Sequence, residues 1–157
     1  MKELLIELYN HQGWAETEYW NAFESFPESL KDKEICDRLY HIYAAQLAFL
    51  LIAQGKRPLV KRLEDIPDMK TLREYGEINQ RSALEFLNDV TEEKLNEVIR
   101  IPWLKDPPLQ LSIGRALIQV VMHSHYHRAQ NSLRLRAIGG IPPTTDFIAW
   151  HWKGLSK

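Results

Sequence analysis

The run from Gly114 to Gly139 constrains the fold more than any other stretch of this sequence. The residues between these two glycines, about two dozen, include neither proline nor glycine. Helical spacing is kept throughout by Leu117, Val120, Val121, Met122, Ala129, Leu133 and Ala137. A strand of this length would far exceed the usual range of roughly 3 to 10 residues, whereas a helix of roughly 36 Å is ordinary in a helical bundle. We therefore predict a helix that ends at Gly139, Gly140 and the prolines after them.

The stretch HSHYHR, residues 123–128, lies inside this run and holds three of the six histidines. In a strand, all three would project from one face. In a helix each residue turns by roughly 100°, so His123 and His127 share a face and His125 lies about 200° away from His123. Such a pair can bind one ion, but six histidines give roughly 0.2 pairs at this spacing by chance. The pair alone is therefore a weak motif, and a metal site needs a ligand from another helix.

The rest of the chain also keeps a helical period. Helices are predicted over 2–26, 29–53 and 68–90, with GKRPLVKRLEDIPD, residues 55–68, as a long crossover connection. After them, Thr91 is placed to cap a short helical turn, and VIRIPWL is predicted to be extended. Glycine, with 7 in the chain, is too scarce for a turn-rich β protein. The prediction is one all-α domain that spans residues 1–157.

Composition excludes several classes of function. The formal net charge of -1 and the pI near 6.6 give no electrostatic basis for nucleic-acid binding. No apolar run approaches the roughly 18 to 20 residues of a membrane span, and the N-terminus lacks the pattern of a signal peptide. We expect a cytoplasmic protein that does not bind a membrane. The lone cysteine, Cys36, excludes an intrachain disulfide and a cysteine-rich zinc site, and it is expected to be a small residue of an apolar face.

His41 is the strongest candidate for a ligand from another helix. Small side chains follow it on its own face and would leave space beside a metal: Ala44, Ala45 and Ala48. Alanine is also a good helix former, so this feature is only mildly diagnostic. His11 lies in the apolar stripe of the first helix, where a core-edge histidine with a hydrogen bond to a neighbour is expected. His125 and His151 are expected at the surface or rim.

These features together resemble the DinB and YfiT-like family of metalloenzymes. The family has a late helix with two histidines four apart, then Arg, Gly and Gln, a Leu-Arg pair, a glycine, paired prolines and an aspartate. The corresponding segments here are HSHYHRAQ, LRLRAIGG and IPPTTDFIAW. LYHIYAAQLAFLL is similar to the family's second helix, and LREYGEINQRSALEFLNDVTEEKL to its third helix and the turn after it. One departure is Ala129, where the family usually has glycine, and this change removes no ligand.

The resemblance implies a four-helix bundle of the DinB/YfiT type with a long crossover connection. It also implies that the metal ligands are His41, His123 and His127, and that the protein is a homodimer. It gives no role to His11, His125 or His151. Arg128 and Gln130 match family positions without assigned chemistry, and Gln130 is a candidate to support a ligand.

Three neutral imidazoles leave at least one open position on a metal, as in catalytic zinc sites. Imidazole suits zinc, nickel, copper or iron, and we expect a divalent ion, zinc or nickel first. The ion could make hydroxide for hydrolysis of a small-molecule substrate, or bind a low-molecular-weight thiol as thiolate for transfer to an electrophile. Resemblance to relatives that use bacillithiol or mycothiol favours the thiol route. No HExxH glutamate follows His123, and Glu16 and Asp37 are expected to be surface charges.

A hypothesis from another class is a non-catalytic, dimeric stress or interaction protein. Its basis is the aromatic tail FIAWHW, with Trp150 and Trp152, which could cover a partner surface. Packing of this tail onto its own helices is at least as compatible with the sequence.

Overall fold

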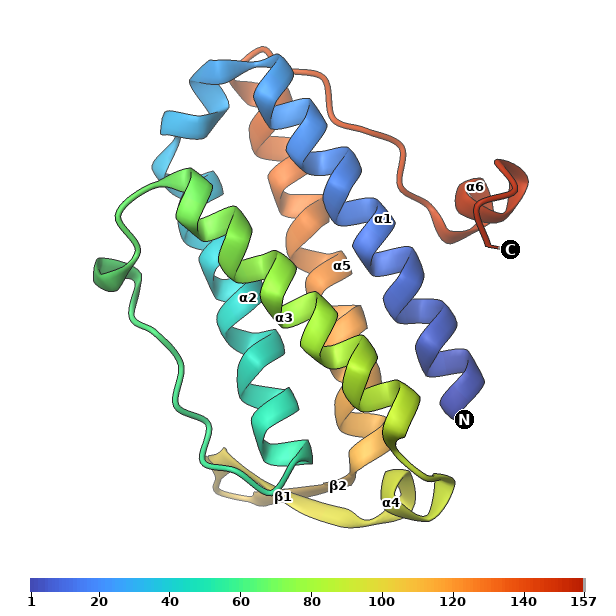
Figure 1. The fold of residues 1–157 in the computed structure, drawn as a ribbon. Coiled ribbons are helices and arrows are strands. Elements are labelled where there is room, and N and C mark those ends of the chain that lie inside the picture. Colours follow the sequence, from blue (N-terminus) through green and yellow to red (C-terminus); the bar gives the residue numbers. More distant parts are fainter. Residues whose placement is uncertain (157) are drawn as a thin grey trace.

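Four long helices form the body of the protein (Figure 1), and the computed structural model describes residues 1–156. They are α1 (Lys2–Ser25), α2 (Lys33–Ala53), α3 (Met69–Asp89) and α5 (Ile113–Ala137). α1 contacts α3 and α5, and α2 contacts the same two helices, so the four close around a common core. The chain is thus mostly helical, as predicted, with one small two-stranded sheet.

Each of the helices after α1 in this core begins at a polar side chain that accepts a hydrogen bond from its first turn. Asp32 accepts from the Ile35 amide and Asp68 from the Thr71 amide, and Ser112 caps α5 in the same way. α2 begins later than predicted because Pro27–Lys31 forms a separate 3-10 turn (η1) and Asp32 then starts the helix. A second 3-10 turn, η2 (Leu63–Asp65), lies in the connection to α3.

A β-hairpin closes the lower end of the helices in Figure 1. Thr91 caps the short helix α4 (Glu92–Asn96), which confirms that prediction. The extended piece is strand β1 (Val98–Lys105), and it pairs antiparallel with β2 (Pro108–Ser112). The second strand was not predicted from PLQLS, because the turn before it lacks the Asn-Gly or Asp-Gly signal of a tight hairpin. β1 contacts α2, and β2 leads directly into α5.

The core has two apolar parts, one toward the hairpin and one at the opposite end. The first includes Leu5, Leu50, Leu117 and Val120, and the second includes Phe23, Ile35, Leu39 and Leu135. Between them, α5 presents a row of buried polar residues: Ser124, Arg128 and Asn131. Cys36 packs against the second part, as expected for a residue of an apolar face.

The chain ends in a short helix, α6 (Phe147–Trp152), that lies beside α1 (Figure 1). Trp150 is buried, and its ring packs at 5.7 Å from the ring of His11. His11 Nε2 lies 2.9 Å from the carbonyl oxygen of Thr145, so the predicted core-edge histidine is confirmed. Trp152 is 87% exposed, and His151 at the rim lies 3.2 Å from Glu7. The tail therefore packs mainly onto its own helices.

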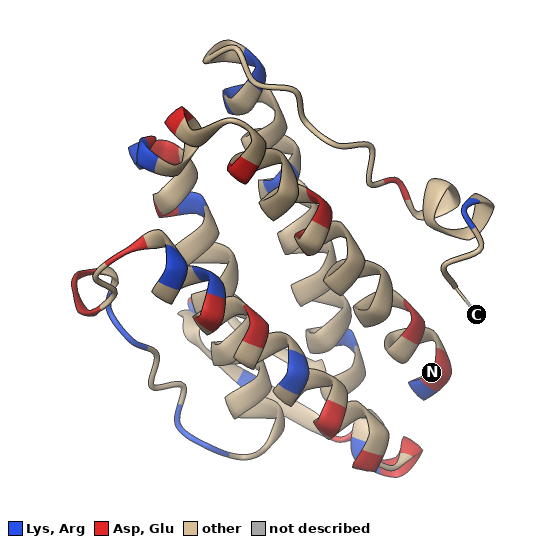
Figure 2. Cartoon of the chain, turned by 45° about the horizontal axis from the view of Figure 1, so that its top comes forward, with Lys and Arg blue, Asp and Glu red and all other residues tan. Residues whose placement is uncertain are grey.

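Charged residues are interspersed rather than gathered by sign (Figure 2). Along α3, for example, Arg73 pairs with Glu77, and Lys70 with Glu74. Among residues 1–156, α2 is the helix long and apolar enough to cross a membrane, with a mean hydropathy of 1.2. It packs against α3 and α5, so its apolar face is accounted for by the core.

Candidate metal centre

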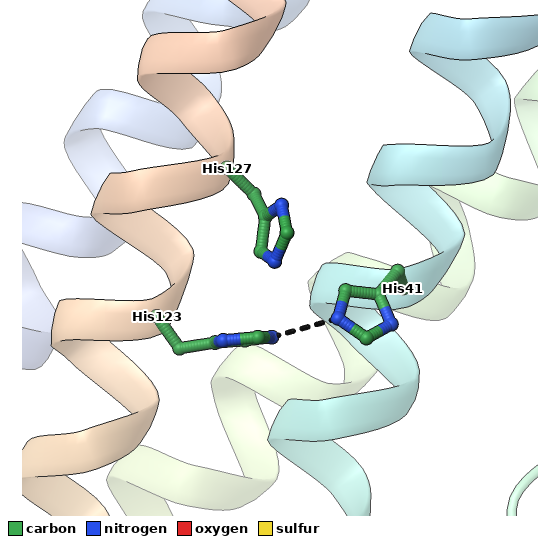
Figure 3. A group of neighbouring side chains, drawn as sticks. All are labelled: His41, His123 and His127. Atoms are coloured by element: carbon green, nitrogen blue, oxygen red, sulfur yellow. Dashed lines mark hydrogen bonds between the residues drawn. The ribbon is translucent and has the colours of Figure 1, made fainter.

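Three histidine side chains meet between α2 and α5 (Figure 3). His41 comes from α2, and His123 and His127 come from successive turns of α5. One ring nitrogen from each lies within 4.8 Å of the other two, and the Nε2 atoms of His41 and His123 are 2.9 Å apart. The three residues expected to be ligands are therefore brought together from two parts of the sequence.

Helix phase explains which histidines take part. His123 and His127 lie one turn apart on the face of α5 that α2 covers, and His41 meets them because α2 and α5 pack directly. His125 is exposed on another face of α5 and does not join the cluster. This is the arrangement predicted from the helical period of the run.

Gln130 fixes the orientation of the His127 ring. The amide Oε1 of Gln130 lies 2.7 Å from Nδ1 of His127, one turn further along α5. Because an amide oxygen only accepts, Nδ1 is the donor, and Nε2 is the nitrogen left to bind a metal. Neighbours of metal-binding histidines commonly hold the ring in this way. The candidate supporting role of Gln130 thus has a structural basis.

Two of the three imidazoles, those of His123 and His41, are favoured in the neutral form at neutral pH. Burial, together with the nearby rings of His127 and His41, lowers the pKa of His123 to about 4. Partial desolvation of the ring, and then the neighbouring His127, also hold the pKa of His41 below its ordinary value. A metal binds the neutral form of histidine, so these rings need not lose a proton to bind one at pH 7.

The donor set fits a divalent ion. In a tetrahedral site with metal–nitrogen distances of about 2.0–2.1 Å, ligand nitrogens lie roughly 3.3–3.4 Å apart. The observed separations run from 2.9 Å to at most 4.8 Å, which small rotations of the rings would bring into this range. Three imidazoles without a carboxylate suit zinc or nickel better than the oxygen-seeking ions magnesium and calcium.

A cavity of about 480 Å³ opens beside His41 and His123. Its α2 wall contains the small side chains predicted to leave space there: Ala44, Ala45 and Ala48. The hairpin supplies the opposite wall through Ile101, Trp103, Leu104, Leu109 and Leu111. The sequence did not predict this second wall, because the pairing of the two strands was not predicted.

Glu16 is not the surface charge that was expected. Its side chain is 15% exposed and accepts a hydrogen bond from the Tyr43 hydroxyl. The same hydroxyl accepts a hydrogen bond from the Trp20 indole nitrogen at 2.9 Å. Burial raises the pKa of Glu16, opposed by the charge of Arg128 and the bond from Tyr43. The expectation was wrong because position 16 lies on the core-facing side of α1. The Asp37 side chain is 42% exposed and pairs with Lys33 at the surface, as expected.

Arg128, to which the sequence analysis gave no role, is buried in the core. It is 2% exposed, its Nη1 lies 3.9 Å from Oε2 of Glu16, and its guanidinium makes no hydrogen bond within residues 1–156. The helical phase of α5 could have predicted that Arg128 is buried. Ser124, Arg128 and Asn131 share the core-facing side of α5 with Leu117, Val121 and Leu135.

A mostly helical protein with a three-histidine cluster between two core helices is the class that the fold and the site define. The family model of the DinB family matches residues 1–154, and the chain belongs to this family. It is also similar to protein DinB of Bacillus subtilis (strain 168). The two are 22% identical over 160 residues, which cover 94% of this chain and 93% of the relative.

Proposed function

We propose that His41, His123 and His127 bind a divalent metal ion, zinc or nickel, and that the protein is a metal-dependent enzyme acting on a small molecule. The observation that carries this proposal is the convergence of three imidazoles from two helices, two of which, His41 and His123, line the end of a cavity. A bound divalent ion would supply a Lewis acid that lowers the pKa of a water or a thiol.

The protein's own residues divide the remaining tasks. Gln130 engages Nδ1 of His127, so that Nε2 is the nitrogen left to bind the metal. The hairpin and α2 line an apolar cavity next to His41 and His123. The Glu16–Arg128 pair lies in the core next to the ligand-bearing turn of α5, and it sets a buried positive charge beside a buried carboxyl group.

We favour transfer from a low-molecular-weight thiol over hydrolysis. The lone cysteine is a poor nucleophile, because burial raises the pKa of the Cys36 thiol and packs it against the core. A thiol nucleophile would therefore come from a co-substrate. Three imidazoles would also support a metal-bound hydroxide, so the preference for thiol transfer rests on the resemblance to relatives that use bacillithiol or mycothiol.

The proposal extends to the wider properties of the protein. The closed ring of contacts among α1, α3, α2 and α5 supports a four-helix bundle of the DinB type, with the α2–α3 connection as its crossover. We also propose a cytoplasmic homodimer that binds neither nucleic acid nor membrane. Interspersed charge supports the absence of nucleic-acid binding, and the exposed Trp152 supports a partner surface on the tail.

The test of the reaction uses the full chain loaded with zinc or nickel. Bacillithiol, glutathione and coenzyme A would each be mixed with monochlorobimane, and an ester panel would test hydrolysis in parallel. We expect metal-dependent conjugation with at least one thiol, which His41→Ala abolishes and His125→Ala retains. Ester cleavage without thiol conjugation would show that the reaction is hydrolysis rather than thiol transfer. The absence of both reactions would contradict an enzyme of either class.

A further inference from the structure

The cavity beside the histidines is markedly apolar for a site next to three polar rings. Apart from His41 and His123 at its end, its lining within residues 1–156 contains one polar side chain, Gln119, and no charged one. Its volume of about 480 Å³ lies within the roughly 300–1,000 Å³ typical of small-molecule sites. We propose that this cavity binds the apolar body of the substrate, an aliphatic or aromatic group with one polar atom directed at the histidines.

The chemistry of the lining decides which substrate occupies it. A thiol that carries a sugar and carboxylates would bury polar groups for which Gln119 is the one non-histidine partner. Burying an unpaired polar group costs about 1–3 kcal/mol or more, so such a thiol is disfavoured there. The inferred occupant is the electrophile, or the acyl part of a hydrolase substrate. This assignment rests on the proposed function for the reaction, but the binding of an apolar group does not.

The hairpin sets the shape of the cavity and is therefore the inferred determinant of substrate specificity. The Trp103 ring packs edge-on against Phe49 of α2, with centroids 5.1 Å apart. Trp103 and Leu104 line the cavity and remain 45% and 44% exposed, so they lie at its open side, where a ligand can reach them. The opposite wall of alanines offers no side chain to fill the space.

The test uses 1-alkanols from butanol to octanol as probes, because their binding requires no metal. Binding to the full chain, metal-free and zinc-loaded, would be followed by NMR titration of the backbone amides of α2 and the hairpin. We expect the dissociation constant to fall about fourfold for each added methylene, until the cavity is filled. The shifts should concentrate at Ala44, Ala45, Ala48 and Trp103.

Two variants and a control complete the experiment. Ala48→Trp should fill the cavity and weaken octanol binding at least about tenfold, while Ala129→Trp, at an exposed position of α5, should not change it. Trp103→Ala should shift the optimum toward longer alcohols, which keeps the proposal testable should Ala48→Trp fail to fold.

The outcomes separate this inference from the proposed function. Alkanol binding that is independent of chain length, or equal in Ala48→Trp and Ala129→Trp, would overturn the apolar site even in a protein that binds zinc. Length-dependent alkanol binding by a chain that binds no metal would support the apolar site and contradict the metal centre.

Discussion

The two ring nitrogens of His127 have separate tasks, one facing Gln130 and one left for the histidine cluster. We expect Gln130→Leu to lower zinc affinity about 10- to 100-fold, because the ring loses the acceptor that fixes its orientation. Gln130→Glu keeps an acceptor and should retain most of the affinity. Competition with a chromophoric chelator measures both constants. Equal affinities for Gln130→Leu and the unaltered protein would show that Nδ1 needs no partner.

The pKa of His123 predicts a dependence of stability on pH in the metal-free protein. This pKa is about 4 in the folded protein, against the ordinary histidine value of 6.5, so the unfolded chain binds more protons between these values. The free energy of unfolding should therefore fall as the pH is lowered from 6.5 toward 4. His123→Gln should flatten this decline when urea unfolding is measured at several pH values, and His125→Gln should leave it unchanged. A decline equally steep in His123→Gln would contradict the assignment.

Single residues show where sequence reasoning works and where it stops. The pair His123 and His127 follows from helix phase alone, whereas His41 needed resemblance, because periodicity within α5 says nothing about which residue of α2 lies opposite. Glu16 was misplaced because a carboxylate is normally exposed, and its partners Tyr43 and Arg128 come from distant segments.

Asp32 joins the two helices that carry the histidines. Its carboxylate caps α2 through the Ile35 amide and also accepts from Arg134 of α5 at 2.7 and 3.0 Å. We expect Asp32→Ala to lower the free energy of unfolding by about 1–2 kcal/mol, since a cap and an ion pair are both lost. Asp32→Asn keeps the cap and should lose clearly less. Urea unfolding at pH 7 measures both, and equal losses would show that the cap contributes nothing.

The long helices were predicted from their period, and of the short elements α4 and β1 were predicted but β2 and α6 were not. The four long helices follow from apolar spacing over about 20 residues or more, although the start of α2 at Asp32 was predicted too early. Strand β2 and helix α6 are 5 and 6 residues long, too short for a period to be recognised. Their positions depend on tertiary contacts: β2 on its pairing with β1, and α6 on the packing of Trp150 against His11.

The attachment of the C-terminal helix matters at the scale of the whole molecule. Trp150 is 4% exposed and Trp152 is 87% exposed, so the two offer a matched comparison. We expect Trp150→Ala to reduce the free energy of unfolding by about 3 kcal/mol, and Trp152→Ala by less than about 0.5 kcal/mol. Chemical unfolding of both variants measures the difference. A small loss in Trp150→Ala would mean that α6 adds little to the stability of the four long helices.

The central claim is that the whole molecule brings three histidines from two helices together to bind one ion. Mass spectrometry of protein purified without a nickel column, after dialysis against trace zinc and nickel, measures metal per chain. We predict about one ion per chain, lost in His41→Ala and His127→Ala and kept in the matched control His125→Ala. An ion retained by His41→Ala and His127→Ala, or lost equally in His125→Ala, would contradict the account.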